Sequence, residues 1–304
     1  ARLMFKLGVV GVDIHKPDRP LIPEMGGLAI VLGLIASSAT LMFAWPQLKV
    51  KAAALILTVL IAAGIGVIDE YRPFRALEKV LALTLAAIPI IALNVYYPYP
   101  QLPFIGSLRL TIIYPYILVP LMVTALANTI NMVDVLNGSM ALTSTISAAF
   151  LTLASAMLGR WEILPLTASL AACTIAFYRH NRFPAKVFAG DVGSLSVGAG
   201  FAAVAIMGRL EVLVAVALIP ALINSGLIVS SLRRLMERRE IKFRPTIVKE
   251  GKIFASGDPR APLTLVRLLA ASKPRSEPEI VRLMAGLTVF SGILTLITAL
   301  LLMV

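Results

Sequence analysis

Residues 112–138 read IIYPYILVPLMVTALANTINMVDVLNG, an apolar stretch that ends in three asparagines and an aspartate. The apolar part, Ile112–Ile130, is long enough for one membrane-crossing helix, which takes roughly 20 residues. Amides and carboxylates near the end of such a span are costly, and they indicate function by default. The stretch therefore predicts a membrane helix with a polar site at one end.

The rest of the chain repeats this apolar pattern. Of its 304 residues, 59% are hydrophobic and 14% are charged, whereas soluble domains are nearer half apolar and a quarter charged. Further spans are predicted over Met25–Trp45, Ala52–Ile68, Val80–Tyr97, Ser139–Leu158, Ile163–Phe177, Leu195–Met207, Val212–Leu232 and Val281–Val304. With Leu3–Val12 interpreted as the end of a truncated first helix, we expect an all-α, polytopic membrane bundle of about ten helices, in one domain over residues 1–304.

Crossing parity divides the loops between two sides of the membrane. The longer polar loops share one side: Asp13–Glu24, Asp69–Lys79, Asn128–Gly138, Tyr178–Ser194 and Arg233–Arg282. Of the 28 Lys and Arg residues, two lie at the uncertain start and 21 on this side, which leaves five on the other: Lys49, Lys51, Arg109, Arg160 and Arg209. The positive-inside rule makes the 21-residue side cytoplasmic, including the large loop 233–280. The net charge of +12 then reflects topology and anionic lipid, and nucleic acid is not an expected partner.

Cysteine and histidine are scarce. Cys173 is the one cysteine, which excludes an intrachain disulfide and a cysteine-based zinc cluster. Since the chain has only two histidines, His15 and His180, a His-rich metal site is not expected.

Asp69 and Glu70 end an apolar span and precede Lys79. A helix C-terminus repels negative charge, so stability alone does not explain two carboxylates there. They can bind Mg²⁺, activate a nucleophile or orient a lysine. The alternative is a solvated helix end, paired with Arg72 and Arg75.

Two further clusters combine amides, an aspartate and glycines. Asn128 and Asn131 share a helical face. Asparagine carbonyls are hard ligands that suit Mg²⁺. The alternative to a Mg²⁺ site is that these amides form hydrogen bonds between helices. Asp191 lies between two glycines before a predicted helix. Free main-chain N–H groups at such a helix start favour phosphate binding. The alternative is that Asp191 serves as the N-cap of the helix. Segment 11–27, read alone, is a charged loop. Together these clusters suit Mg²⁺-assisted phosphoryl transfer between a nucleotide and a lipid.

The motifs NTINMVDVLNG (residues 128–138) and PAKVFAGDVGS (residues 184–194) resemble those of the polyprenyl-phosphate N-acetylhexosamine-1-phosphate transferases. The resemblance implies a UDP-N-acetyl sugar, a polyprenyl phosphate, release of UMP, a Mg²⁺ cofactor and a cytosolic site. GVDIHK and IPE look like the eukaryotic and archaeal branch, which transfers GlcNAc-1-phosphate to dolichyl phosphate. The last cytoplasmic loop has no histidine, unlike the MurNAc-pentapeptide translocases.

The same resemblance implies roles for single residues. Asn131 and Asp191 match the Mg²⁺ ligands, and the catalytic group is Asp69, Glu70 and Lys79, with Lys79 on phosphate. Asp69 carries more weight, because the family has paired aspartates where this chain has Asp69-Glu70. Residues expected to bind the substrates are Asp13, Lys16, Glu24, Asn128, Asn137, Phe188 and Arg244, with Asn137 and Phe188 at the uracil and Arg244 at the pyrophosphate. The expected partners are UDP-GlcNAc, polyprenyl phosphate, membrane lipids and a second copy in a homodimer.

Two other classes remain open at this point. A transporter or flippase also carries polar groups in its spans, although usually at mid-membrane and in repeated halves. A phospholipid headgroup transferase shares the Mg²⁺ chemistry but predicts CDP-linked substrates and a metal site richer in aspartate. A different UDP-N-acetylhexosamine is the remaining alternative within the family.

Overall fold

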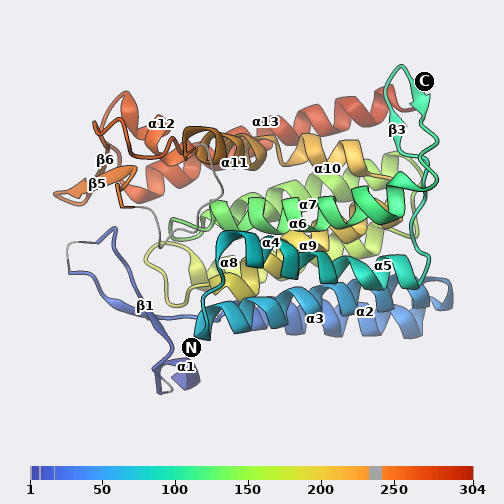
Figure 1. Cartoon of the computed structure of the whole chain (residues 1–304), viewed down its shortest axis with the longest axis horizontal. Helices are drawn as coiled ribbons and strands as arrows, with labels where there is room; N and C mark the ends of the chain where they lie inside the picture. Colours follow the sequence, from blue (N-terminus) through green and yellow to red (C-terminus); the bar gives the residue numbers. More distant parts are fainter. Residues whose placement is uncertain (1, 7, 17, 233–241, 304) are drawn as a thin grey trace.

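The apolar stretches form long helices that run side by side between two ends of a bundle (Figure 1). The computed structural model describes all residues except 1, 7, 17, 233–241 and 304, so the start of the predicted cytoplasmic loop lies outside it. The long elements are α2 Gly27–Ala44, α3 Lys49–Tyr71, α6 Val119–Val133, α7 Ser139–Met157, α8 Leu164–Asn181, α9 Gly190–Gly208 and α13 Glu277–Leu301.

Within the described residues, six helices are long and apolar enough to cross a membrane, or seven if a bent pair counts as one span. This confirms a polytopic helical membrane protein; the predicted count of about ten helices is not confirmed. The bent pair is α10 Glu211–Ala217 and α11 Ile219–Leu232, which meet at 76°. Pro220, near the start of α11, has no N–H to continue the hydrogen bonds of α10.

The span predicted over Val80–Tyr97 is broken. Its residues belong to α4 Ala76–Thr84, a 3-10 turn at Leu85–Ala87 and α5 Ile88–Ala92. Pro89 cannot donate to a carbonyl one turn earlier, and its ring crowds that carbonyl, which accounts for the tighter turn. By contrast, the span predicted over Leu195–Met207 is one unbroken helix, α9, which begins earlier than predicted, at Gly190.

The prediction that Leu3–Val12 is the end of a helix is wrong beyond Lys6. The short α1 covers Arg2–Lys6, and Gly8 then turns the chain with a φ of +72°. Strand β1, Val10–Val12, pairs antiparallel with β2, Leu21–Pro23. A hairpin at the end of the bundle therefore holds the loop that carries Asp13 and Lys16.

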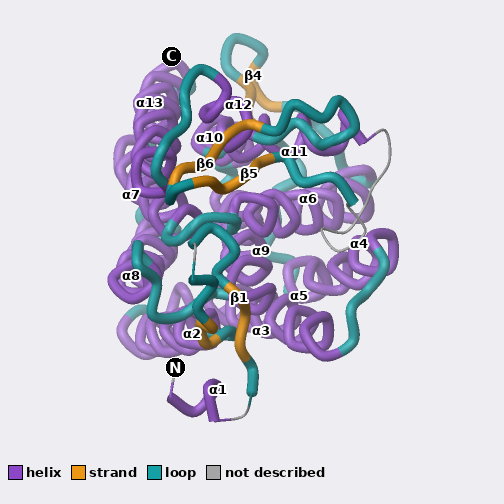
Figure 2. Tube along the Cα trace, turned by 90° about the vertical axis from the view of Figure 1, so that its left-hand side faces the viewer, coloured by secondary structure: helices purple, strands orange, loops and turns teal. Residues whose placement is uncertain are grey.

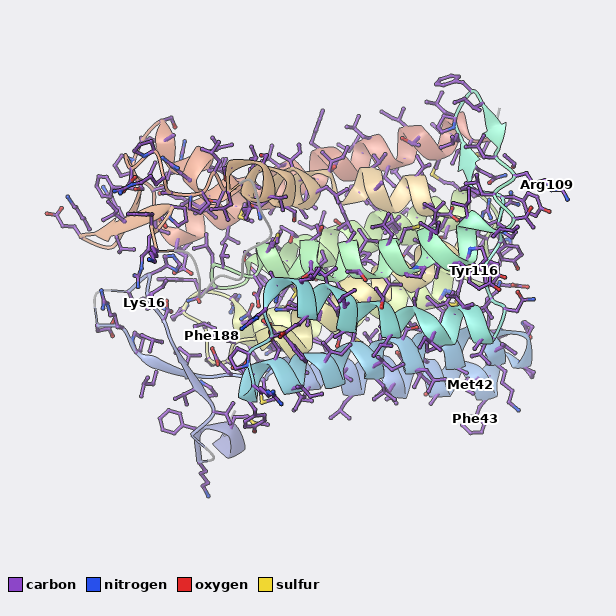
Figure 3. The ribbon with its side chains drawn as sticks, viewed as in Figure 1. Lys16, Met42, Phe43, Arg109, Tyr116 and Phe188 are labelled. Atoms are coloured by element: carbon purple, nitrogen blue, oxygen red, sulfur yellow. The ribbon has the colours of Figure 1, made fainter. Side chains whose placement is uncertain are left out.

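The remaining strands lie at the ends of the bundle (Figure 1). A hairpin of β5 Thr246–Lys249 and β6 Lys252–Ala255, followed by α12 Leu265–Ala271, shares one end with β1. The opposite end carries the small hairpin of β3 Gln101–Leu102 and β4 Gly106–Ser107. In Figure 3, Lys16 and Phe188 mark the first end, while Arg109 marks the second. The sequence-based grouping of these loops is therefore confirmed.

Helix α9 lies in the middle of the bundle, with α2, α3, α6 and α8 around it (Figure 2). Every residue from Val192 to Gly208 is buried. Close contact depends on small residues: a Cβ on Gly66 of α3 would lie 2.6 Å from the main-chain nitrogen of Val192, and Gly27 of α2 faces Gly193 directly. Without a hydrophobic force between helices in lipid, such contacts provide the packing. They fix the start of α9, and with it Asp191.

Candidate active site

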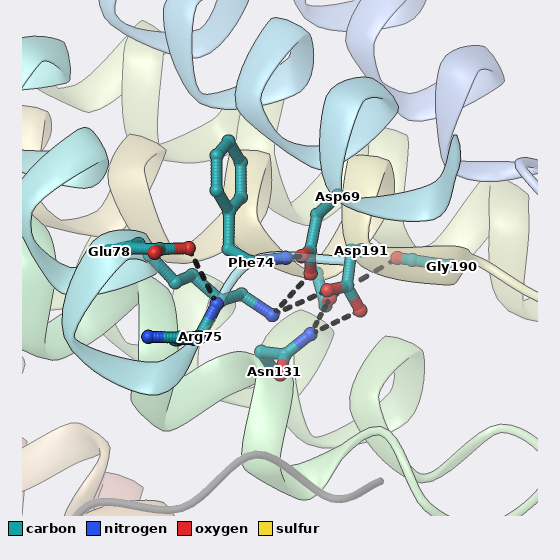
Figure 4. A network of polar contacts seen from close by, with 9 residues as sticks. Asp69, Phe74, Arg75, Glu78, Asn131, Gly190 and Asp191 are labelled. Carbon is teal, nitrogen blue, oxygen red and sulfur yellow. Dashed lines mark hydrogen bonds and ion pairs between the residues drawn. The ribbon is translucent and has the colours of Figure 1, made fainter. Parts of the chain in front are cut away.

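Asp69 and Asp191 come from different helices and lie close together (Figure 4), and Lys79 forms an ion pair with both. Its ammonium nitrogen lies 2.9 Å from Asp69 Oδ2 and 2.5 Å from Asp191 Oδ2. Asp69 is in the last turn of α3, and its Oδ1 accepts the N–H of Phe74 at 2.7 Å, which fixes the chain that leads into α4. Since Asp69 is 6% and Lys79 2% exposed, Asp69 is part of a buried ion cluster. The alternative of a solvated helix end is wrong for this residue.

Asn131 brings a fourth helix, α6, to the same point. Its amide Nδ2, in the last turn of α6, donates to Asp191 Oδ1 at 2.8 Å and to Ser194 Oγ at 2.9 Å. Asp191 lies in the first turn of α9, where the helix dipole favours a negative charge. The ends of α3, α6 and α9 thus meet with their polar groups in contact (Figure 4).

A cavity of about 1090 Å³ opens beside this cluster. Eleven of the twelve residues predicted to form the site line it: Asp13, Glu24, Asp69, Glu70, Lys79, Asn128, Asn131, Asn137, Phe188, Asp191 and Arg244. Their positions in the sequence span more than two hundred residues. They come from the N-terminal hairpin, from helices α3, α4, α6 and α9, from the segments just before α7 and α9, and from the last loop. The geometry places them together, while their individual roles remain predictions.

The N-terminal loop joins the site through Asp13. This residue is 3% exposed, forms an ion pair with Lys16 and accepts the side-chain amide of Asn137 at 3.0 Å. Burial raises the pKa of the Asp13 carboxyl, but hydrogen bonds from Lys16 and Asn137 outweigh it, so the pKa lies below its usual 3.8. Lys16, the twelfth predicted residue, is outside the cavity lining and acts on the site through Asp13.

Two further predicted residues are held by their own segments. Asn128 donates its amide to the carbonyl of Thr124 at 2.9 Å, one turn back in α6. The carboxylate of Glu24 lies against Gly11, and a Cβ on Gly11 would be 2.0 Å from Glu24 Oε1, so a larger residue there would displace this carboxylate. Gly11 therefore leaves room for the side chain of Glu24, the residue after β2, to reach the cavity.

Three buried residues were missed by the sequence interpretation: Asn181, Asn224 and Glu277. All three hold main-chain groups of segment 132–138. Asn224 donates to the Met132 carbonyl at 3.0 Å, Glu277 accepts the N–H of Asn137 at 2.5 Å, and Asn181 accepts the N–H of Gly138 at 3.1 Å. Asn181 also donates to the Val187 carbonyl at 2.9 Å, beside Phe188. Their only signal in the sequence is a polar residue near the end of a predicted span or, for Asn224, inside one.

The charges that line the cavity suit a cation together with a phosphorylated ligand. Among the described lining residues, six carboxylates face four Lys and Arg side chains, so a diphosphate needs further positive charge to bind here. No group of three His, Cys, Asp or Glu side chains in the described ranges could hold a metal alone. Asp191 and the Asn131 amide still fit Mg²⁺, which commonly uses one or two protein oxygens, substrate phosphates and water.

Comparison with protein families gives the same interpretation. The family model for glycosyl transferase family 4 matches residues 52–209, which contain Asp69, Lys79, Asn131, Asn137 and Asp191. The chain belongs to this family. It is therefore an enzyme of a glycosyl-1-phosphate transferase family and an integral membrane protein.

Three curated relatives of this family-4 chain illustrate its range. A Saccharolobus solfataricus protein, provisionally named a UDP-N-acetylglucosamine–dolichyl-phosphate N-acetylglucosaminephosphotransferase, is 32% identical over 219 residues, 71% of this chain and 67% of the relative. A provisionally named glycosyltransferase of Methanocaldococcus jannaschii is 30% identical over 95% of this chain and 88% of its own. The phospho-N-acetylmuramoyl-pentapeptide-transferase of Halalkalibacterium halodurans is 29% identical over 63% of this chain and 62% of its own.

Proposed function

We propose that the protein transfers GlcNAc-1-phosphate from UDP-GlcNAc to a polyprenyl phosphate of the dolichyl type and releases UMP. The observation that carries this is the cluster in which Lys79, Asp69, Asp191 and Asn131 meet at the rim of a cavity lined by both amides and arginines. The name of the Saccharolobus solfataricus relative supports the choice of sugar and acceptor.

In this reaction an oxygen of the acceptor phosphate attacks the β-phosphorus of UDP-GlcNAc. The new P–O bond forms as the bond to the bridging oxygen of the α-phosphate breaks, and UMP leaves. Lys79 and Arg244 offset the negative charge of the diphosphate, which is the main requirement of phosphoryl transfer. Asp69 orients the acceptor or takes its proton, and Asn137 and Phe188 hold the uracil.

Mg²⁺ is the expected cofactor, with Asn131 and Asp191 as its protein ligands. When bound, it supplies Lewis-acid neutralisation of the diphosphate. The structure supports this through hard oxygen donors and an excess of carboxylates in the cavity. Lys79 already occupies Asp191 Oδ2, so its ammonium would turn from this carboxylate toward phosphate as the ligands enter.

We further propose that the site faces the cytoplasm. The five loops that the sequence assigns to this side carry 21 of the 28 Lys and Arg residues, against five in the loops assigned to the other side. Positive charge is retained on the cytoplasmic side of the membrane, where nucleotide sugars are made. The clustering of polar groups at one end also disfavours a transporter, which needs access from both sides.

Mass spectrometry of the lipid product tests the proposal. Purified protein is incubated with polyprenyl phosphate, Mg²⁺ and one of UDP-GlcNAc, UDP-GalNAc, UDP-glucose or UDP-MurNAc-pentapeptide. A polyprenyl diphosphate GlcNAc product with equimolar UMP supports it. Product from UDP-MurNAc-pentapeptide alone would reassign the sugar, and gradient-driven uptake into proteoliposomes without UMP release would favour the transporter.

A further inference from the structure

Glu277, the first residue of α13, is buried against the segment that carries Asn137. Its side chain is 3% exposed, and Oε1 accepts the main-chain N–H of Asn137 at 2.5 Å, across 140 positions of sequence. Within the described part of the chain, Oε2 is buried and has no hydrogen-bond partner. Burying a carboxylate that is only partly satisfied costs free energy. This position therefore needs an explanation beyond the fold.

The start of α13 does not require this burial. Ser276 and Glu279 form a capping box, in which Glu279 Oε2 accepts the N–H of Ser276 at 2.7 Å. Glu279 also supplies a negative charge near the helix N-terminus, where the dipole favours one. The helix start is thus satisfied by Ser276 and Glu279, so it does not explain why Glu277 is buried.

Asn137 is held from two directions. Glu277 fixes its main-chain N–H, and Asp13 fixes its side-chain Nδ2 at 3.0 Å. Neither bond uses the amide oxygen. Asn137 is 5% exposed and lines the cavity, so small changes in its backbone position move the amide relative to a bound ligand. Two carboxylates, one from α13 and one from the N-terminal loop, thus set the orientation of one amide.

We propose that Glu277 is a positioning residue for nucleobase selection: it holds Asn137 in the orientation that recognises uracil. The role rests on the proposed function, in which Asn137 contacts the base. Glu277 itself does not line the cavity. Its loss therefore weakens the contribution of the base to binding and leaves the phosphate contacts of Lys79 and Arg244 in place.

Two substitutions separate the effect of the length of the Glu277 side chain from the effect of its charge. Glu277→Asp keeps the carboxylate but shortens it by one methylene, so it withdraws from the Asn137 N–H. Glu277→Gln keeps the length and an oxygen acceptor while it removes the charge. Glu279→Gln is the matched control, because it changes an acid in the same helical turn that has no contact with Asn137.

The measurement compares the affinities of UMP and ribose 5-phosphate for the purified protein with Mg²⁺, by calorimetry. Their ratio reports the contribution of the base. We expect Glu277→Asp to lower the ratio about tenfold, as a hydrogen bond to a charged group predicts, and Glu277→Gln to lower it less than about threefold. In the transfer assay the same loss should appear in KM for UDP-GlcNAc, with kcat nearly unchanged.

A ratio in Glu277→Asp equal to that of the wild type overturns the inference. The inference is also overturned if Glu277→Gln or Glu279→Gln loses all preference for UMP over ribose 5-phosphate. The Glu277→Gln result decides the case even if Glu277→Asp does not fold. A wild type that transfers GlcNAc-1-phosphate without preferring UMP over ribose 5-phosphate removes this inference alone. A wild type that binds neither compound removes the proposed function as well.

Discussion

The ammonium of Lys79 separates two buried carboxylates, with 2.9 Å to Asp69 and 2.5 Å to Asp191. Lys79→Met would leave these carboxylates close together with no cation between them. Breaking a buried ion pair in this way costs about 3–5 kcal/mol. We therefore expect a clear drop in the thermal unfolding midpoint of the purified protein, together with loss of transfer activity.

A lysine at the other end of the bundle provides the control. Lys51 lies 2.5 Å from the largely exposed carboxylate of Glu162, and exposed pairs of this kind contribute about 0–1 kcal/mol. Lys51→Met should therefore unfold close to the wild-type midpoint. Mg²⁺ should raise the midpoint of Lys79→Met more than that of the wild type, because it replaces the missing ammonium. An equal rise in both proteins would contradict competition between Lys79 and the metal for Asp191.

Asp13 gives a pH prediction at the same scale. Its folded-state pKa lies below 3.8, because hydrogen bonds from Lys16 and Asn137 outweigh burial. The stabilisation is therefore complete above the unfolded-state pKa and is lost as the pH falls through the folded-state pKa. Below about pH 4 the unfolding midpoint should fall more steeply for the wild type than for Asp13→Asn. Asp18→Asn, at an exposed site in the same loop, should follow the wild type.

Among the helices, α3 contains a matched pair of glycines. A Cβ on Gly66 would lie 2.6 Å from the Val192 nitrogen, whereas a Cβ on Gly64 meets nothing within 4 Å. Gly64→Ala should leave stability and activity near wild type, since alanine favours the helix. Gly66→Ala should push α3 away from the start of α9, lower the unfolding midpoint and reduce activity at least tenfold by displacing Asp191. Equal behaviour of the two variants in thermal unfolding and transfer assays would contradict this packing.

The elements also show where sequence interpretation succeeds. Hydropathy predicts the spans, and the alternation of successive membrane crossings predicts that Asp69, Asn131 and Asp191 lie at the same end of the bundle. In the structure these residues belong to one polar cluster. Hydropathy does not register the break at Pro89, because both halves remain apolar. Nor does it single out Glu277, whose partner is a main-chain N–H 140 positions away. Contacts to distant backbone leave no pattern in a single sequence.

Considered as a whole, the molecule has two ends of opposite character, and the account assigns the end with the cavity to the cytoplasm. Two exposed positions can report on this: Glu250 beside the β5–β6 hairpin and Arg109 after β4. In a Cys173→Ser background, a membrane-impermeant maleimide added to intact cells should label the R109C variant. The E250C variant should be labelled only after permeabilisation, and the reverse pattern would place the site outside.

The central claim is that Asp191 and Asn131 support Mg²⁺-dependent attack on UDP-GlcNAc beside Lys79. The most direct measurement is the Mg²⁺ dependence of UMP release by purified protein supplied with UDP-GlcNAc and polyprenyl phosphate. The account predicts saturable Mg²⁺ dependence in the wild type and in Asp258→Asn, whose carboxylate pairs with Arg260 away from the cavity. It predicts a loss of about a thousandfold, or ~4 kcal/mol, in Asp191→Asn. Undiminished Mg²⁺-dependent UMP release by Asp191→Asn would contradict it.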